Sequence, residues 1–180
     1  DMLTPNPTTV TEHLVDRYAE EFNGWHSLAT QPGIIRPDEF AWAWRNLDRL
    51  ASLEASWTAA VADGTTLVHC DVRADNILLT ERGVFLVDWP HAVAGPAWID
   101  LLLMMPSAMM QGIDDAERVW RDYPPARRAD PDAVNAVLAA VAGFFVSSSL
   151  QPAPLNLPNL RAFQAAQGRT ALTWLRERLG

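Results

Sequence analysis

The stretch His69-Cys70-Asp71-Val72-Arg73-Ala74-Asp75-Asn76 decides how the rest of this chain is interpreted. A short β-type run, Thr66-Leu67-Val68, comes before it, and two more runs, Ile77-Leu78-Leu79 and Val84-Phe85-Leu86-Val87, come after it. Glu81-Arg82-Gly83 lies between the last two runs and predicts a tight turn. The sequence therefore predicts a small three-strand insert over residues 66–89, with polar side chains at the ends of its strands.

Outside this insert, the apolar residues recur with the period of an amphipathic helix. Val10, Leu14, Tyr18 and Phe22, for example, lie four positions apart and share one helical face. Helices are expected over approximately residues 10–22, 37–61, 97–110, 114–120, 131–150 and 160–179, with a loop from Asn23 to Gly33. The predicted fold class is therefore α+β and mainly α, a helical bundle that carries a small β-hairpin insert.

The length and composition of the chain fit a protein of one domain. Its 180 residues are enough to build one hydrophobic core, so residues 1–180 are predicted to form a single domain. Cys70 is the only cysteine, which excludes an internal disulfide and favours the cytoplasm. The longest apolar run identified, Ile99–Met105, is far shorter than the roughly 20 residues of a membrane span. No membrane association is therefore expected.

The charge of the chain narrows its expected partners. With 14 basic and 22 acidic residues the net charge is −8, and nucleic-acid binding is not expected because it needs clustered cations. The chain contains no lysine, since all of its basic residues are arginine. Any function that requires a lysine must obtain it from another chain or another segment.

Three polar residues around the insert have the types and spacing that phosphoryl transfer requires. Asp71 follows the first strand, Asn76 comes five residues later, and Asp88 ends the third strand. Transfer from a nucleotide needs one carboxylate that orients and deprotonates the acceptor hydroxyl. It also needs an amide and a second carboxylate to hold magnesium, a hard cation that prefers oxygen ligands and keeps several waters. The hairpin is expected to bring Asn76 and Asp88 close together.

These motifs resemble those of the aminoglycoside phosphotransferase family, small-molecule kinases related to the protein kinases. The family pattern His-x-Asp-x-x-x-x-Asn matches residues 69–76, and its Asp-Trp pair matches Asp88-Trp89. Gly95-Pro96-Ala97-Trp98-Ile99-Asp100-Leu101 resembles the downstream Asp-Leu segment of the family, at the start of a helix. The resemblance implies the C-terminal lobe of a protein-kinase-like fold, with residues 67–103 as its diagnostic part.

The resemblance also implies roles for the site residues. Asp71 would be the catalytic base, and Asn76 and Asp88 would be the Mg²⁺ ligands, with ATP or GTP as the phosphoryl donor. Arg73 lies where protein kinases place a phosphate-contacting lysine, so it is expected to touch the transferred phosphoryl group. The acceptor is expected to be the hydroxyl of a small molecule, such as an aminoglycoside, another sugar or an amino alcohol.

Three neighbouring residues are expected to have no direct part in the chemistry. His69 is predicted to orient the loop through hydrogen bonds. Asp100 lies among apolar residues and needs partners for its carboxylate, for which the backbone of the catalytic loop is favoured. Cys70 occupies a position where relatives often have glycine, and it is interpreted as a small buried thiol.

One half of a kinase of this class is not recognisable in the sequence. The N-terminal lobe of such a kinase supplies a glycine-rich loop over the phosphates and a lysine for the α- and β-phosphates. The nine glycines form no Gly-x-Gly-x-x-Gly pattern, and lysine is absent. We therefore expect a C-terminal lobe whose N-terminal nucleotide-binding lobe is missing and which is inactive by itself. The alternative is a noncatalytic kinase-like module used for binding or scaffolding.

Overall fold

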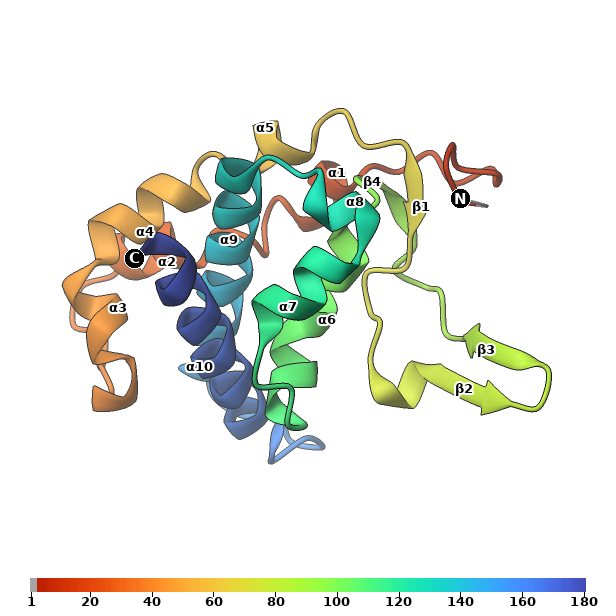
Figure 1. Ribbon diagram of the computed structural model, residues 1–180. Helices are drawn as coiled ribbons and strands as arrows, with labels where there is room; N and C mark the ends of the chain where they lie inside the picture. Colours follow the sequence, from red (N-terminus) through yellow and green to blue (C-terminus); the bar gives the residue numbers. More distant parts are fainter. Residues whose placement is uncertain (1–2) are drawn as a thin grey trace. The chain divides into compact units, whose positions relative to one another are not determined.

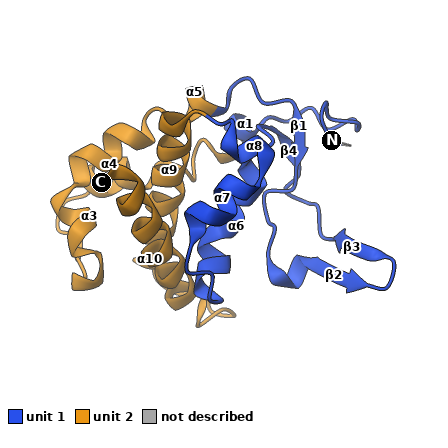
Figure 2. Ribbon diagram, viewed as in Figure 1, with its two compact units in different colours: residues 1–17, 61–129 blue, residues 18–60, 130–180 orange. Residues whose placement is uncertain are grey.

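The computed structural model describes residues 3–180 and consists of helices and two small sheets (Figure 1). The chain forms two compact units (Figure 2). Unit 1 comprises the residues up to 17 together with 61–129, and unit 2 comprises residues 18–60 together with 130–180. The predicted class, α+β and mainly α, is confirmed at this level. That residues 1–180 form a single kinase-like lobe stays a prediction.

Unit 2 is a bundle of helices centred on α9 (Pro131–Ser149). This helix packs against α10 (Leu160–Leu179), α2 (Gly24–Thr30) and α4 (Leu47–Glu54). The other helical segments are shorter and come from the first stretch of the unit: η1 (Asp38–Phe40), α3 (Ala41–Arg45) and α5 (Trp57–Val61), which ends at the border of unit 1.

Helix α9 is the buried element of this bundle. Asp130 caps its N-terminus by accepting a hydrogen bond from the backbone N–H of Asp132, and Pro131 occupies the first turn, as helix starts favour. By length and composition, α9 is the one helix within residues 3–180 that is apolar enough to cross a membrane. The longest apolar run therefore lies in α9, and the identification of Ile99–Met105 as that run was wrong. Of the 18-residue apolar window within α9, 56% is buried inside the structure, as is typical of a core helix.

Helices α2 and α9 approach so closely that glycine is needed where they meet. A Cβ atom on Gly24 would lie 2.1 Å from the carbonyl oxygen of Gly143 and 2.2 Å from its carbonyl carbon. A Cβ atom on Gly143 would instead meet side chains, at 2.5 Å from Oε1 of Glu54 and 2.8 Å from Cδ1 of Trp25. Gly24 therefore permits contact between backbones, and it begins a helix where the sequence predicted a loop.

Glu54 is a buried carboxylate beside this contact. Its side chain is 2% exposed, and its two oxygens accept hydrogen bonds from the backbone N–H groups of Trp25, at 3.0 Å, and His26, at 2.9 Å. These N–H groups belong to the first turn of α2, where a helix leaves its donors without partners. Burial raises the pKa of Glu54 from its ordinary value of 4.5 to about 7, although the backbone hydrogen bonds oppose this shift.

This buried carboxylate makes stability depend on pH. Because the pKa of Glu54 is higher in the folded protein than in the unfolded chain, the folded state binds the proton more tightly. The contribution of Glu54 to the free energy of unfolding should therefore be fully present at pH 4.5 and below, and it should be lost as the pH rises to 7, a change of at most about 3 kcal/mol.

Urea unfolding of the native chain and of Glu54→Gln between pH 4.5 and 8 measures this contribution. The difference in unfolding free energy between the two proteins should change with pH, because glutamine does not titrate. Glu177→Gln, at an exposed position of α10, is the control and should follow the native profile. Parallel profiles for the native chain and Glu54→Gln would contradict the assignment.

Unit 1 contains two separate two-stranded antiparallel sheets. Strand β1 (Thr66–Val68) pairs with β4 (Val93–Gly95), and β2 (Ile77–Thr80) pairs with β3 (Gly83–Leu86). The three predicted strands are present, but they do not form one sheet, because β1 pairs with β4, a strand that was not predicted. The helical segments of the unit are α1 (Leu14–Tyr18), which ends at the border of unit 2, η2 (Ala74–Asn76), α6 (Ile99–Met110), α7 (Ala116–Asp122) and α8 (Pro124–Arg127).

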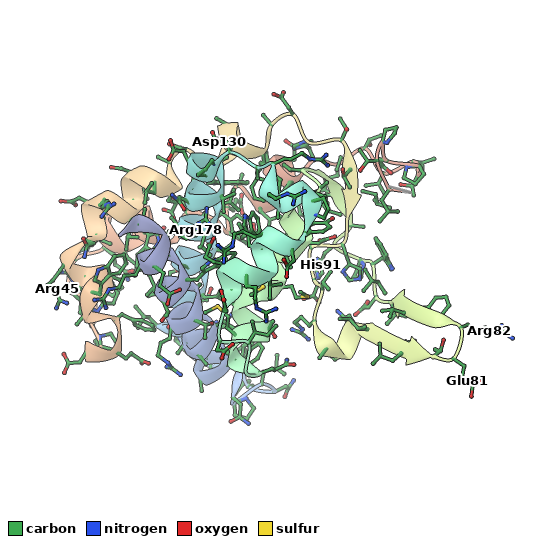
Figure 3. All side chains as sticks on the ribbon, viewed as in Figure 1. Arg45, Glu81, Arg82, His91, Asp130 and Arg178 are labelled. Atoms are coloured by element: carbon green, nitrogen blue, oxygen red, sulfur yellow. The ribbon has the colours of Figure 1, made fainter. Side chains whose placement is uncertain are left out.

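The β2–β3 hairpin extends away from the rest of unit 1, with Glu81 at its tip (Figure 3). Its cross-strand pairs Leu78–Phe85 and Leu79–Val84 lie on opposite faces, since successive residues of a strand alternate. All four side chains are exposed, by 48% to 79%. Neither face of the hairpin is therefore covered by the residues that the structure describes.

The helix predictions held in the second half of the chain and failed in part in the first half. Helices α6, α7, α9 and α10 lie close to their predicted positions, whereas α8 was not predicted. The helix expected over residues 10–22 is reduced to α1, and part of the expected loop that follows forms α2. The single helix expected over residues 37–61 is divided into η1, α3, α4 and α5.

Candidate active site

His69 holds the loop formed by residues 69–76, which leads from β1 to β2. The side chain is fully buried, with Nε2 at 2.8 Å from the carbonyl oxygen of Val87 and Nδ1 at 3.2 Å from the backbone nitrogen of Asp71. A carbonyl only accepts and a backbone N–H only donates, so the ring carries its hydrogen on Nε2 and accepts at Nδ1. His69 thereby fixes the loop at Asp71 and the end of the hairpin at Val87. Its ring also packs 4.5 Å from that of Trp89.

Asp100 binds the start of the same loop from the first turn of α6. Its carboxylate accepts the backbone N–H of His69, at 3.0 and 2.9 Å from the two oxygens, and the backbone N–H of Cys70 at 2.8 Å. Burial raises the pKa of Asp100, and these hydrogen bonds oppose the rise. These hydrogen bonds join α6 to backbone N–H groups of the loop. They therefore do not depend on which side chains the loop carries.

Asp71 and Asn76 are brought together. The Nδ2 atom of Asn76 donates to the carbonyl oxygen of Asp71, at 2.9 Å, and to its Oδ2 atom, at 3.0 Å. Both acceptors are oxygens, so this contact requires the NH₂ group of Asn76, and its Oδ1 atom is left without a hydrogen bond to the described residues. The amide therefore orients the Asp71 carboxylate and keeps one oxygen available for a cation.

Arg73 forms ion pairs with two aspartates of the loop. Its guanidinium forms two hydrogen bonds with Asp75, at 3.1 and 2.5 Å, and its Nε atom lies 3.7 Å from Oδ1 of Asp71. The hydrogen bonds with Asp75, and to a lesser degree the charges of Asp71 and Asp88, raise the pKa of Arg73. The Arg73 guanidinium therefore interacts electrostatically with the carboxylates of Asp71 and Asp88, and its positive charge lies next to Asp71, the predicted base.

Asp88 is placed by the hairpin. The backbone N–H of Val87 donates to the carbonyl oxygen of Asn76 at 3.0 Å, so the chain segments that carry Asn76 and Asp88 lie side by side. The Asp88 side chain is exposed and forms no hydrogen bond or ion pair with the residues the structure describes. It is therefore near Asn76 and free to bind a cation, but no direct contact joins it to Asp71.

Two residues of the site have a left-handed backbone. Cys70 has φ = 63° and Asp88 has φ = 64°, and they are the only residues other than glycine with positive φ in the described chain. This conformation costs an L-residue roughly 1–2 kcal/mol. Glycine would adopt this conformation at position 70 without that cost. Strain of this kind concentrates at functional sites, where the surrounding contacts maintain it.

Three contributors to the site were not predicted. Asp75 is the main partner of Arg73, and opposite charges two residues apart were the available sequence signal. The carbonyl of Val87 binds His69, and no sequence signal indicates a backbone acceptor. Tyr123 donates to the carbonyl oxygen of Ala97 at 3.0 Å; burial and the nearby charge of Asp100 raise the pKa of Tyr123, so it lies beside the α6 end of the site.

The donor set suits a hard divalent cation. Asn76 and Asp88 offer one amide oxygen and one carboxylate, and Mg²⁺ is usually bound by few protein oxygens with waters completing its shell. No cluster of three histidine, cysteine or acidic residues able to hold a metal occurs within residues 3–180. The residues therefore fit a weakly held, substrate-associated Mg²⁺ better than a structural metal such as zinc.

Comparison with known proteins gives one match. A family model described as "Phosphotransferase enzyme family" matches residues 11–137, which is more than half of the chain and includes the whole candidate site. No curated protein and no solved structure matched the chain. The family match extends through both sheets and into the start of α9, so the motif does not stand alone.

Proposed function

The chain belongs to the phosphotransferase enzyme family, and we propose that it carries the acceptor side and the metal side of an enzyme that phosphorylates a hydroxyl group of a small molecule. The donor in this proposal is ATP or GTP. The observation that supports it most is the hydrogen bond from Asn76 to the Asp71 carboxylate, beside Arg73. A general base must be oriented before it can accept a proton from an incoming hydroxyl.

In the proposed reaction, the acceptor oxygen attacks the γ-phosphorus as the bond from the γ-phosphorus to the β–γ bridging oxygen breaks. The nucleoside diphosphate leaves, and the proton of the hydroxyl passes to Asp71. The short contact to Asn76 restrains the carboxylate, so that its other oxygen faces the acceptor. Arg73 lies 3.7 Å from this oxygen and supplies positive charge where the phosphoryl oxygens would gather.

Asn76 and Asp88 would hold Mg²⁺ in this proposal. When bound, the ion neutralises the negative charge of the nucleotide phosphates. The Oδ1 atom of Asn76 and the carboxylate of Asp88 are the available oxygens described above. His69 supports this arrangement indirectly, because it binds the carbonyl oxygen of Val87, the residue before Asp88.

The nucleotide-binding lobe is proposed to come from a segment that these 180 residues do not include. A lysine for the nucleotide phosphates is absent from the chain, as is a glycine-rich loop. The exposed apolar side chains on both faces of the β2–β3 hairpin are the surface in unit 1 that such a lobe and a bound base would cover. A cytoplasmic location remains a prediction.

A phosphoryl-transfer assay tests the proposal. The protein would be expressed with any segment that its gene encodes before Asp1, and incubated with γ-labelled ATP or GTP, Mg²⁺ and a panel of aminoglycosides, sugars and amino alcohols. Transfer that depends on Mg²⁺ to one acceptor class is the expected result. If no acceptor is phosphorylated and neither nucleotide raises the melting temperature, the noncatalytic module is the better account.

A further inference from the structure

Unit 2 contains a pocket of about 450 Å³ that three arginines line. Arg36 comes from the segment before η1, Arg45 from the end of α3, and Arg49 from the first turn of α4. Figure 3 shows Arg45 extending outward from the end of α3. None of these residues belongs to the loop that carries Asp71, so the pocket is not part of the candidate active site.

The three cations lack acidic partners. Within the described part of the chain, Arg45 and Arg49 form no hydrogen bond or ion pair, and Arg36 has only the ring of Trp44, with its guanidinium carbon 5.9 Å from the ring centroid. Asp48 is the one acidic residue among the lining residues. The lining therefore carries a net charge of +2, in a chain whose total net charge is −8. Three unneutralised guanidinium groups around one hollow favour an anionic ligand.

Trp44 gives the pocket an apolar wall with a fixed position. Its indole N–H donates to the carbonyl oxygen of Pro37 at 2.9 Å, so the polar atom of the ring already has a partner. Phe40 and Trp25 meet the ring edge-on, with centroids 6.2 and 6.4 Å away. These three contacts hold the ring before any ligand binds, and its half-buried surface can pack against a flat apolar group.

We propose that this pocket binds a phosphate monoester of a small organic molecule, with the phosphate among the three arginines and the organic part against Trp44. A phosphate offers three terminal oxygens, and a guanidinium donates to phosphate oxygens in pairs. A volume of about 450 Å³ lies within the range for small-molecule sites, so the pocket has room for more than a bare anion. This inference does not depend on the proposed phosphotransferase reaction.

Isothermal titration calorimetry with phenyl phosphate and with inorganic phosphate, at 150 mM NaCl, tests the proposal. The double variant Arg45→Gln/Arg49→Gln should bind phenyl phosphate at least ten times more weakly than the native chain. Its fold should persist, because neither arginine has a partner among residues 3–180, and circular dichroism checks this. Phenyl phosphate should also bind the native chain more tightly than inorganic phosphate, since only the former has a ring to pack on Trp44.

Arg127→Gln/Arg128→Gln is the matched control, because it removes the same charge at two neighbouring exposed positions that do not line this pocket. This variant should bind phenyl phosphate as the native chain does. Equal weakening in both double variants would show a general effect of net charge and would overturn the proposal. So would the absence of binding to the native chain at millimolar concentrations, or equal affinity for the two probes.

Discussion

Asp71→Asn should reduce the rate constant kcat of phosphoryl transfer by about 10²–10⁴-fold, the usual contribution of a general base. Asparagine has nearly the same shape and keeps an oxygen that can accept the hydrogen bond from Asn76, at the position where Oδ2 now lies 3.0 Å away. The variant should therefore fold and melt as the native protein does. What it loses is a group that can take the proton of the acceptor hydroxyl.

The measurement is steady-state transfer to whichever acceptor the panel identifies, with KM determined separately from kcat. Asp75→Asn is the matched control, because it removes an equal charge two residues from Arg73 and four residues from Asp71, and it changes only the exposed ion pair with Arg73. A modest loss is expected there, since Arg73 remains beside Asp71. If Asp71→Asn keeps more than a tenth of the native kcat, Asp71 is not the base.

Asp100→Ala should have the largest effect on stability, lowering the free energy of unfolding by about 2–4 kcal/mol. The substitution leaves the backbone N–H groups of His69 and Cys70 without their acceptor. In the native protein, burial of the Asp100 carboxylate costs desolvation free energy, and this burial raises the pKa of Asp100. Asp100→Ala removes that cost, so the net loss of unfolding free energy is smaller. Asp100→Asn keeps one oxygen and should lie between the native chain and the alanine variant.

Urea unfolding at pH 7 compares these variants with Asp114→Ala, an exposed aspartate of the same unit. The control should change the unfolding free energy by less than about 0.5 kcal/mol, as surface substitutions usually do. A loss below 1 kcal/mol for Asp100→Ala would mean that water or another acceptor satisfies the two N–H groups. In that case Asp100 would not be the support of the loop.

Part of the site could be predicted from the sequence because its residues lie close to one another along the chain. Asp71 and Asn76 are five residues apart on one loop, and the turn at Glu81-Arg82-Gly83 fixes the hairpin that returns the chain to Asp88. The role of each residue in catalysis still depends on the resemblance to the family. The ion pair of Asp75 with Arg73 was not predicted, because the spacing of two residues does not by itself show that the two side chains meet.

The failures in the fold have tertiary causes. Strand β4 has only three residues, and its partner β1 lies more than twenty positions earlier, so neither length nor alternation marks it. Gly24 is an ordinary helix terminator by composition, yet it starts α2 because the backbone of α9 passes beside it. The periodicity over residues 37–61 is helical throughout, but local propensity does not show where packing divides it into several short helices.

The contact between α2 and α9 also limits how this sequence can diverge. The obstacle to a side chain at position 24 is the backbone of Gly143, and no substitution at 143 removes a backbone atom. The obstacles at position 143 are the side chains of Glu54 and Trp25, which can shrink. Among descendants that keep this fold, position 24 should remain glycine, whereas position 143 should accept alanine in lineages where position 54 or 25 has become smaller.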